Sequence, residues 1–179
     1  MTHSHRTTKH IAYSAVLLAI ALVLPNIVGS IPKIGNMLCP MHIPVLLCGF
    51  ICGWPWGMLI GFIAPLLRGA IFGVPPFIPK GFSMAMELAT YGFVSGIIFK
   101  FSKKTMRDIY ISLIVSMLCG RLVWGVMRWV LSFVTGEPFT FEAFIAGGFT
   151  TAIPGIIVQL ILIPVLVKLI RSSKVLYGT

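Results

Sequence analysis

Residues 40–96 read PMHIPVLLCGFICGWPWGMLIGFIAPLLRGAIFGVPPFIPKGFSMAMELATYGFVSG and form three apolar segments joined by very short connections. The second segment carries Arg68 and the third carries Glu87, although hydrocarbon disfavours both side chains. An ionisable residue at the centre of a bilayer is costly, so it faces a cavity or a partner and not lipid. The stretch therefore predicts membrane-spanning helices that enclose a polar cavity.

The composition of the whole chain is that of an integral membrane protein. Hydrophobic residues make up 58% of the 179 positions and charged residues only 10%, whereas a soluble domain has about 25% charged residues. The net charge of +10 is typical of basic cytoplasmic loops, which orient membrane proteins, so we do not expect nucleic acid as a partner. The length suits one membrane domain over residues 1–179 without an added soluble domain.

Proline and glycine breaks divide the chain into six predicted spans, so the predicted fold is an all-α bundle of six transmembrane helices. The spans cover about residues 11–24, 41–53, 57–72, 79–101, 109–134 and 141–170. The first is expected to stop at Pro25-Asn26, because proline has no amide donor. The second is short for a bilayer that needs about twenty apolar residues. We expect it to extend toward Trp54 and Trp56, around a tight turn at residues 53–57.

Basic residues are unevenly divided between the two sets of connections. The face that holds both chain ends carries Arg6, Lys9, Lys100, Lys103, Lys104, Arg107, Lys168, Arg171 and Lys174. The opposite face carries only Lys33 and Lys80. The positive-inside rule therefore predicts that the N and C termini are cytoplasmic and that the connections at 25–40 and 73–79 are external.

With this orientation, Arg68, Glu87, Arg121 and Arg128 project from the outer half of the bundle. Arg121 and Arg128 are seven residues apart and share a helix face. One glutamate does not neutralise three arginines, and guanidinium groups bind carboxylates in a planar, bidentate way. The pattern therefore indicates an anionic ligand. The alternatives are structural ion pairing and, for Arg128, a side chain that reaches the membrane surface.

Four further residues are candidates for contacts with the ligand. The connection at 25–40 is apolar for a loop and is interpreted as a lid over the cavity or as a surface hairpin. Asn36 and His42 would supply polar contacts from this region, although His42 suits the membrane interface equally well. Trp124 is expected to form a wall, and Trp124 and Tyr91 would stack on a flat aromatic ligand.

Several stretches resemble one known family, the S components of energy-coupling factor (ECF) transporters, which capture vitamins for uptake. They are the segment MHIPVLLCGFICGWPWGMLIGFIAPLLRGAIFG, the segment MELATYGFVSGIIF, the stretch GRLVWG at 120–125, and the Ala15-xxx-Ala19 pair of the first span. The resemblance extends over nearly the whole chain and is densest between Met41 and Gly96.

The resemblance implies a subunit of a multi-pass transporter in a prokaryotic cell (plasma) membrane. Its partners would be a membrane coupling subunit, which docks on Ala15 and Ala19, and two ABC-type ATPases. The family assigns no catalytic residues to this subunit, and the sequence has no GxxxxGK[ST] phosphate loop, so we expect no enzymatic activity. Four cysteines lack the spacing of a metal site, and we expect neither metal nor cofactor.

The choice of substrate rests on local similarity. The MHIP pattern at residues 41–44 resembles the branch that includes pantothenate, riboflavin and folate carriers. Pantothenate is the first choice, because it is small and polar and carries one carboxylate for an arginine. Riboflavin, folate, a pyridoxine-like ligand and a pyrimidine stay open. A small channel or a structural membrane protein is the alternative class, although a channel should show a ring of polar residues around a pore.

Overall fold

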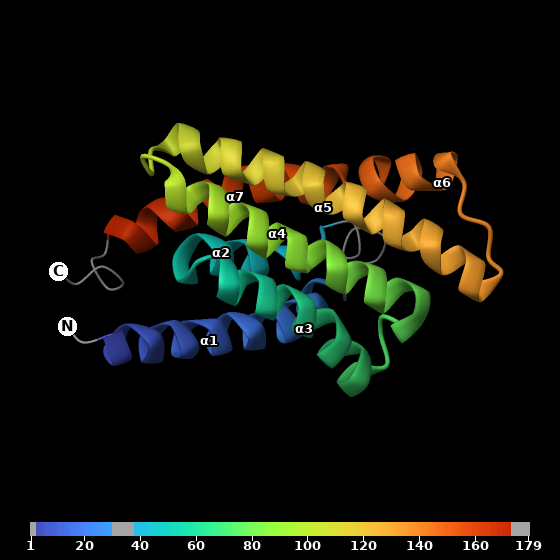
Figure 1. Ribbon diagram of the computed structural model, residues 1–179, viewed down its shortest axis with the longest axis horizontal. Helices are drawn as coiled ribbons and strands as arrows, with labels where there is room; N and C mark the ends of the chain where they lie inside the picture. Colours follow the sequence, from blue (N-terminus) through green and yellow to red (C-terminus); the bar gives the residue numbers. More distant parts are fainter. Residues whose placement is uncertain (1–2, 30–37, 173–179) are drawn as a thin grey trace.

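The computed structural model describes residues 3–29 and 38–172, and this part of the chain is helical without a β-strand (Figure 1). The elements are α1 (His3–Gly29), α2 (His42–Cys52), α3 (Trp54–Phe72), η1 (Phe77–Gly81), α4 (Phe82–Phe101), α5 (Met106–Thr135), α6 (Phe141–Ile145), η2 (Ala146–Thr150) and α7 (Ile153–Ser172). Five helical stretches within the described residues are long and apolar enough to cross a membrane, and α2 is a shorter apolar helix. The predicted all-α membrane fold is therefore confirmed.

The first helix is longer than predicted. The chain stays helical through Pro25 as far as Gly29, so the expected stop at Pro25-Asn26 is wrong. Membrane helices tolerate an internal proline where other groups satisfy the carbonyls that it disturbs. Here Arg68 Nη1 donates a hydrogen bond to the carbonyl of Leu22, 2.9 Å away and in the turn before Pro25.

The second helix ends earlier than predicted. Its 11 residues correspond to about 16 Å, roughly half of the hydrocarbon thickness. Gly53 has a φ of 91°, a conformation that favours glycine, and it ends α2. Trp54 and Trp56 belong to α3, so the expected extension of α2 into them and the expected turn over 53–57 are both wrong.

The last predicted span corresponds to one apolar helical stretch, Phe141–Ser172, which is not a regular α-helix throughout. Instead of one helix over 141–170, the chain forms α6, η2, a turn at residues 151–152, and α7. Pro154 lies in the first turn of α7, where a missing amide hydrogen is tolerated, whereas a continuous helix would bring its ring against the carbonyl of Thr150. The fourth span agrees better, because Ile78 is extended and the helical chain starts at Pro79.

Close backbone contacts hold α2, α3 and α4 together. A Cβ atom on Gly92 of α4 would overlap backbone atoms of Gly57 in α3, and one on Gly57 would lie 2.7 Å from the Cα of Gly49 in α2. Small residues at such crossings let membrane helices approach closely. Ten of the 11 residues of α2 are buried, so this short helix lies inside the bundle.

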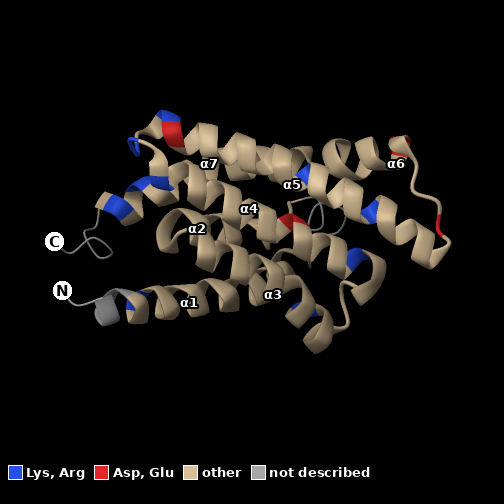
Figure 2. Cartoon of the chain, viewed as in Figure 1, with Lys and Arg blue, Asp and Glu red and all other residues tan. Residues whose placement is uncertain are grey.

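The two ends of the bundle differ in charge. The start of α1, the connection from α4 to α5 and the end of α7 lie at one end, and the connections that follow α3 and α5 lie at the other (Figure 1). Lys and Arg gather at the first end (Figure 2). Helix α1 is at the edge of the bundle, and only 11% of its most apolar window is buried.

Replacing Gly92 with Ala should destabilise the protein, because the added methyl group has no space at the crossing of α3 and α4. We expect a loss of about 1–3 kcal/mol, the range for overpacked cores, measured as a lower unfolding midpoint in detergent. Gly29→Ala is the matched control, since a Cβ there meets nothing within 4 Å. Equal midpoints for the two variants would show that the close crossing is not formed.

Candidate binding site

A cavity of about 600 Å³ lies where α2 begins. Its walls include residues 39–42, which lead into α2, and residues 74–76 of the connection after α3. Residues 38–41, directly before α2, are not helical, and Cys39, Pro40 and Met41 among them line the cavity. Volumes of about 300–1,000 Å³ are usual for pockets that hold small molecules.

The floor of the cavity is a buried ionic cluster of Glu87, Arg121 and His42. Nη1 of Arg121 lies 2.8 Å from Oε1 of Glu87, and Nε2 of His42 lies 3.5 Å from the same oxygen. The exposed fractions are 2% for Glu87, 3% for His42 and 6% for Arg121. The N–H groups are not aligned with the oxygen, so Oε1 of Glu87 is an ion-pair partner without a well-directed hydrogen bond. The cluster joins α2, α4 and α5.

Arg68 lines the cavity from α3 and is bound to a different neighbour. Its Nη1 donates to the Leu22 carbonyl, and its guanidinium lies 5.3 Å from the centre of the Phe72 ring. The structure records no ion pair for Arg68 within residues 3–29 and 38–172. Among the charged residues of the cavity, Glu87 contacts Arg121 and His42 and does not pair with Arg68.

Two further cations line the same cavity, Lys80 from η1 and Arg128 from α5. The guanidinium of Arg128 lies 5.4 Å from the centre of the Phe139 ring, and its Nη1 is buried without a hydrogen-bond partner. Arg128 is half-buried at the cavity wall, whereas the alternative interpretation placed it at the membrane surface. The sequence analysis counted Lys80 only as a basic residue of the face opposite the chain ends and did not name it as a ligand contact.

Trp124 forms part of the wall, held by aromatic neighbours. It stacks on Phe144 at 6.2 Å and meets the edge of Phe139 at 5.7 Å. A Cβ on Gly147 of η2 would lie 2.9 Å from the indole ring, so η2 packs closely on this tryptophan. The wall therefore depends on the interrupted last span as well as on α5.

Tyr91 lies beneath the cavity and does not line it. It is one turn after Glu87 on α4, is 1% exposed, and meets the His42 ring edge-on at 5.3 Å between ring centres. A Cβ on Gly120 of α5 would overlap its ring. Tyr91 therefore packs against the ionic cluster, and its ring is not accessible for stacking on a ligand in the cavity.

The start of α2 adds to the positive character of the cavity. No side chain caps this helix, and residues 39–42 face the cavity. The N-terminal end of a helix carries a partial positive charge and favours anions. Of the charged side chains that line the cavity, four are cations (Arg68, Lys80, Arg121 and Arg128) and one is a carboxylate (Glu87).

Six of the eight residues predicted to bind substrate lie around this one cavity: Arg68, Glu87, Arg121, Trp124, His42 and Arg128. Tyr91 is one layer below, and Asn36 lies outside the described residues. Sequence reasoning missed Met84 and Cys39 as lining residues. Cys39 was interpreted as a packing residue, yet its Sγ lies 4.0 Å from Nη2 of Arg121.

Comparison with known proteins shows the family to which this chain belongs. The family model for the ECF transporter, substrate-specific component, matches residues 9–167. Neither the comparison with curated proteins nor that with solved structures finds a match. Because the family model extends over most of the sequence, the chain belongs to the ECF transporter substrate-specific component family and is the substrate-binding subunit of such an importer.

Proposed function

We propose that this subunit captures a small, water-soluble vitamin or related metabolite that carries a carboxylate, with pantothenate as the first choice. The observation that carries the proposal is the excess of cations at the cavity, four against one carboxylate. Like charges brought together in a site of low dielectric repel one another, and a bound anion relieves this repulsion. The partial positive charge at the start of α2 also favours an anionic ligand.

The geometry suggests different roles for the two ends of the ligand. Arg68 has no ion-pair partner among the described residues and would hold the carboxylate, with Arg128 as a second cation. The cluster on the floor would contact hydroxyl or amide groups. Both ring nitrogens of His42 and Nε of Arg121 are buried without hydrogen-bond partners, and a ligand that supplies those partners removes a desolvation cost.

A flat aromatic vitamin such as riboflavin is the second candidate, because Trp124 lines the cavity. Phe144 stacks on one side of this indole, and Tyr91 is too deep to form the opposite wall. A single tryptophan gives less stacking than a ligand sandwiched between two rings needs. The charge excess therefore outweighs the aromatic feature, and pantothenate stays the first choice.

We propose that both termini are cytoplasmic and that the cavity opens to the outside. Lys103 and Lys104 lie between α4 and α5, Arg107 is in the first turn of α5, and Gly136 follows α5. The connection between α4 and α5 and the C-terminal end of α5 lie at opposite ends of the bundle (Figure 1). Basic connections stay on the cytoplasmic side. A reporter fused after Lys104 should therefore be cytoplasmic and one at Gly136 external. An external reporter at Lys104 would contradict this orientation and place the cavity on the inner side.

We propose that the exposed face of α1 docks on the coupling subunit of the importer. Ala15 and Ala19 are exposed on this helix, which is the least buried of the candidate spans. Small side chains four residues apart let a partner helix approach closely. The neighbouring exposed residues Val16 and Val23 are 58% and 51% exposed.

Ala15→Leu combined with Ala19→Leu should abolish uptake in cells that produce the complete importer, because the larger side chains hold the partner helix away. Binding of ligand to the isolated subunit, measured by calorimetry, should stay unchanged, since neither residue lines the cavity. Val16→Leu with Val23→Leu is the control and should retain uptake. Normal uptake by the alanine variant would exclude this face as the docking surface.

Arg68→Ala should weaken pantothenate binding at least about tenfold, because a hydrogen bond to a charged group contributes roughly 1.5–3 kcal/mol. Arg68→Lys should give an intermediate loss, since lysine keeps the charge but lacks the planar fork. Arg107→Ala, an exposed position outside the cavity, is the control. Unfolding midpoints of the variants separate a loss of binding from a loss of the Arg68–Leu22 contact.

Calorimetry with pantothenate and its primary amide tests the ligand charge itself. The acid should bind at least about tenfold more tightly than the amide. Equal affinities would show that the arginines are structural and that the anionic assignment is wrong. Tight binding of riboflavin with no binding of either compound would favour the aromatic candidate.

A further inference from the structure

A second pocket, of about 470 Å³, lies at the basic end of the molecule, far from the cavity just described. It is lined by Lys104 from the connection between α4 and α5, by Met106 and Ile109 from the start of α5, and by Lys168, Arg171 and Ser172 from the end of α7. Its three cations thus come from segments more than 60 residues apart in sequence. None of its lining residues is acidic.

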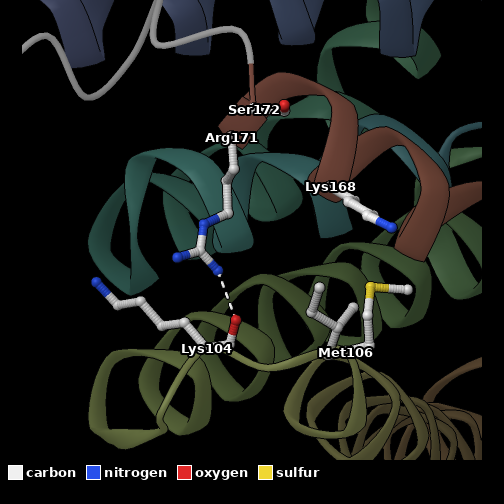
Figure 3. A pocket seen from close by; sticks show the side chains of 6 residues that line it. Lys104, Met106, Lys168, Arg171 and Ser172 are labelled. Atoms are coloured by element: carbon white, nitrogen blue, oxygen red, sulfur yellow. Dashed lines mark hydrogen bonds between the residues drawn. The ribbon is translucent and has the colours of Figure 1, made fainter.

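The pocket has a defined geometry. Nη1 of Arg171 donates to the carbonyl of Lys104 at 2.8 Å, and the Arg171 guanidinium lies 5.4 Å from the centre of the Phe99 ring. Figure 3 shows Arg171 extending from α7 toward Lys104, and Lys168 extending from the same helix on the side of the pocket where Met106 lies. Lys104 has a φ of 59°, an uncommon conformation for a non-glycine residue that tertiary contacts must hold.

Asp108, in the first turn of α5, carries a carboxylate close in sequence to the pocket residues Met106 and Ile109, and this carboxylate already accepts hydrogen bonds. Oδ2 of Asp108 accepts hydrogen bonds from the backbone N–H and the side-chain hydroxyl of Thr105, both at 2.9 Å. These bonds cap the start of α5. Asp108 therefore acts at the helix terminus and does not line the pocket.

Exposed apolar side chains neighbour the pocket residues in sequence on α5 and α7, at the ends of two candidate membrane spans. Ile109, on the floor of the pocket, is buried. Val165 and Leu169, beside Lys168 on α7, are 49% and 59% exposed, and Tyr110 on α5 is 40% exposed. A ligand that fits this surface has an anionic group for the cations and hydrocarbon chains for the flanking helices. A free anion would leave the apolar part without a partner.

We infer that this pocket binds the phosphate-bearing headgroup of an anionic phospholipid in the leaflet at the basic end of the bundle. Basic pockets between membrane helices recognise such headgroups, and arginine pairs with phosphate through its planar fork. The bound lipid would link α7 to the connection between α4 and α5, on the side of the molecule opposite the substrate cavity. This inference does not depend on the identity of the substrate.

Native mass spectrometry of the full chain in detergent tests the inference, with dioleoyl phosphatidylglycerol and dioleoyl phosphatidylcholine as probes that have the same acyl chains. The protein should retain phosphatidylglycerol at least about tenfold more strongly. Lys104→Gln with Lys168→Gln should remove this preference. The matched control is Lys9→Gln with Lys103→Gln, which removes equal charge from exposed positions that do not line the pocket and should keep the preference.

Each other outcome would overturn the inference. An equal loss in both double variants would show a non-specific charge effect, and equal retention of the two lipids would exclude headgroup recognition. Inorganic phosphate that raises the unfolding midpoint as much as phosphatidylglycerol does would identify a free-anion site. The variant with Lys104→Gln and Lys168→Gln could retain lipid unchanged but no longer assemble with the other subunits of the importer. This result would identify the pocket as a contact with another subunit. The unfolding midpoint of each variant in detergent verifies that it is folded.

Discussion

The ion pair between Glu87 and Arg121 is the interaction on which the cavity depends. It joins α4 to α5 within a bundle of apolar helices, with exposed fractions of 2% and 6% for the two side chains. Breaking a buried pair by removing one partner costs about 3–5 kcal/mol, because a charge is left uncompensated. The pair therefore fixes the floor of the cavity, and Tyr91 and His42 pack against it.

Two features of the backbone create the space above this pair. Helix α2 begins only at His42, with its N-terminal end facing the cavity. The glycine contacts among α2, α3 and α4 draw these helices together at a different level of the bundle. Close packing at one level and a short helix at the other leave the cavity above the ion pair. Buried charges are then stable where they are, because each faces a partner or the cavity and not lipid.

The sequence was informative where a residue type conflicts with its surroundings. Arg68, Glu87 and Arg121 stand out in apolar segments, and the structure places all three around one cavity. The groups with which these three side chains interact were less predictable. A pattern of side chains does not reveal that Arg68 bonds to a backbone carbonyl of α1, since every helix residue has such a carbonyl. The Pro25 error has the same origin, because tertiary contacts decide whether a proline ends a membrane helix.

Lys80 shows a second limit of sequence reasoning. It lies at the start of the predicted fourth span, where a lysine at the membrane surface is ordinary, so nothing in its local sequence distinguishes a cavity residue from a solvated one. Only the return of η1 toward α5 makes it a lining residue, and that path depends on contacts between segments distant in sequence. The boundary between α2 and α3, in contrast, has a local signal in the sequence. Gly53 precedes Pro55 there, and this combination favours a helix that starts at Trp54.

Substrate capture and docking involve different physical properties of this chain. In the proposed capture, the mutual repulsion of the cations that line the cavity falls when an anion enters, so occupancy should change the stability of the residues around the cavity. In the proposed docking, Ala15 and Ala19 on the exposed face of α1 contact a partner helix through small apolar side chains, so this contact does not depend on charge. Arg68 bonds to α1 at Leu22, and Pro25 of α1 also lines the cavity, so occupancy of the cavity has two direct routes to that helix. A carboxylate that competes for the Arg68 guanidinium would weaken the Leu22 bond just before Pro25, where the helix already lacks an amide donor. The proposed docking helix is thus joined to the cavity at Leu22 and Pro25, while the Ala15–Ala19 face is about one to two turns from Leu22 along α1.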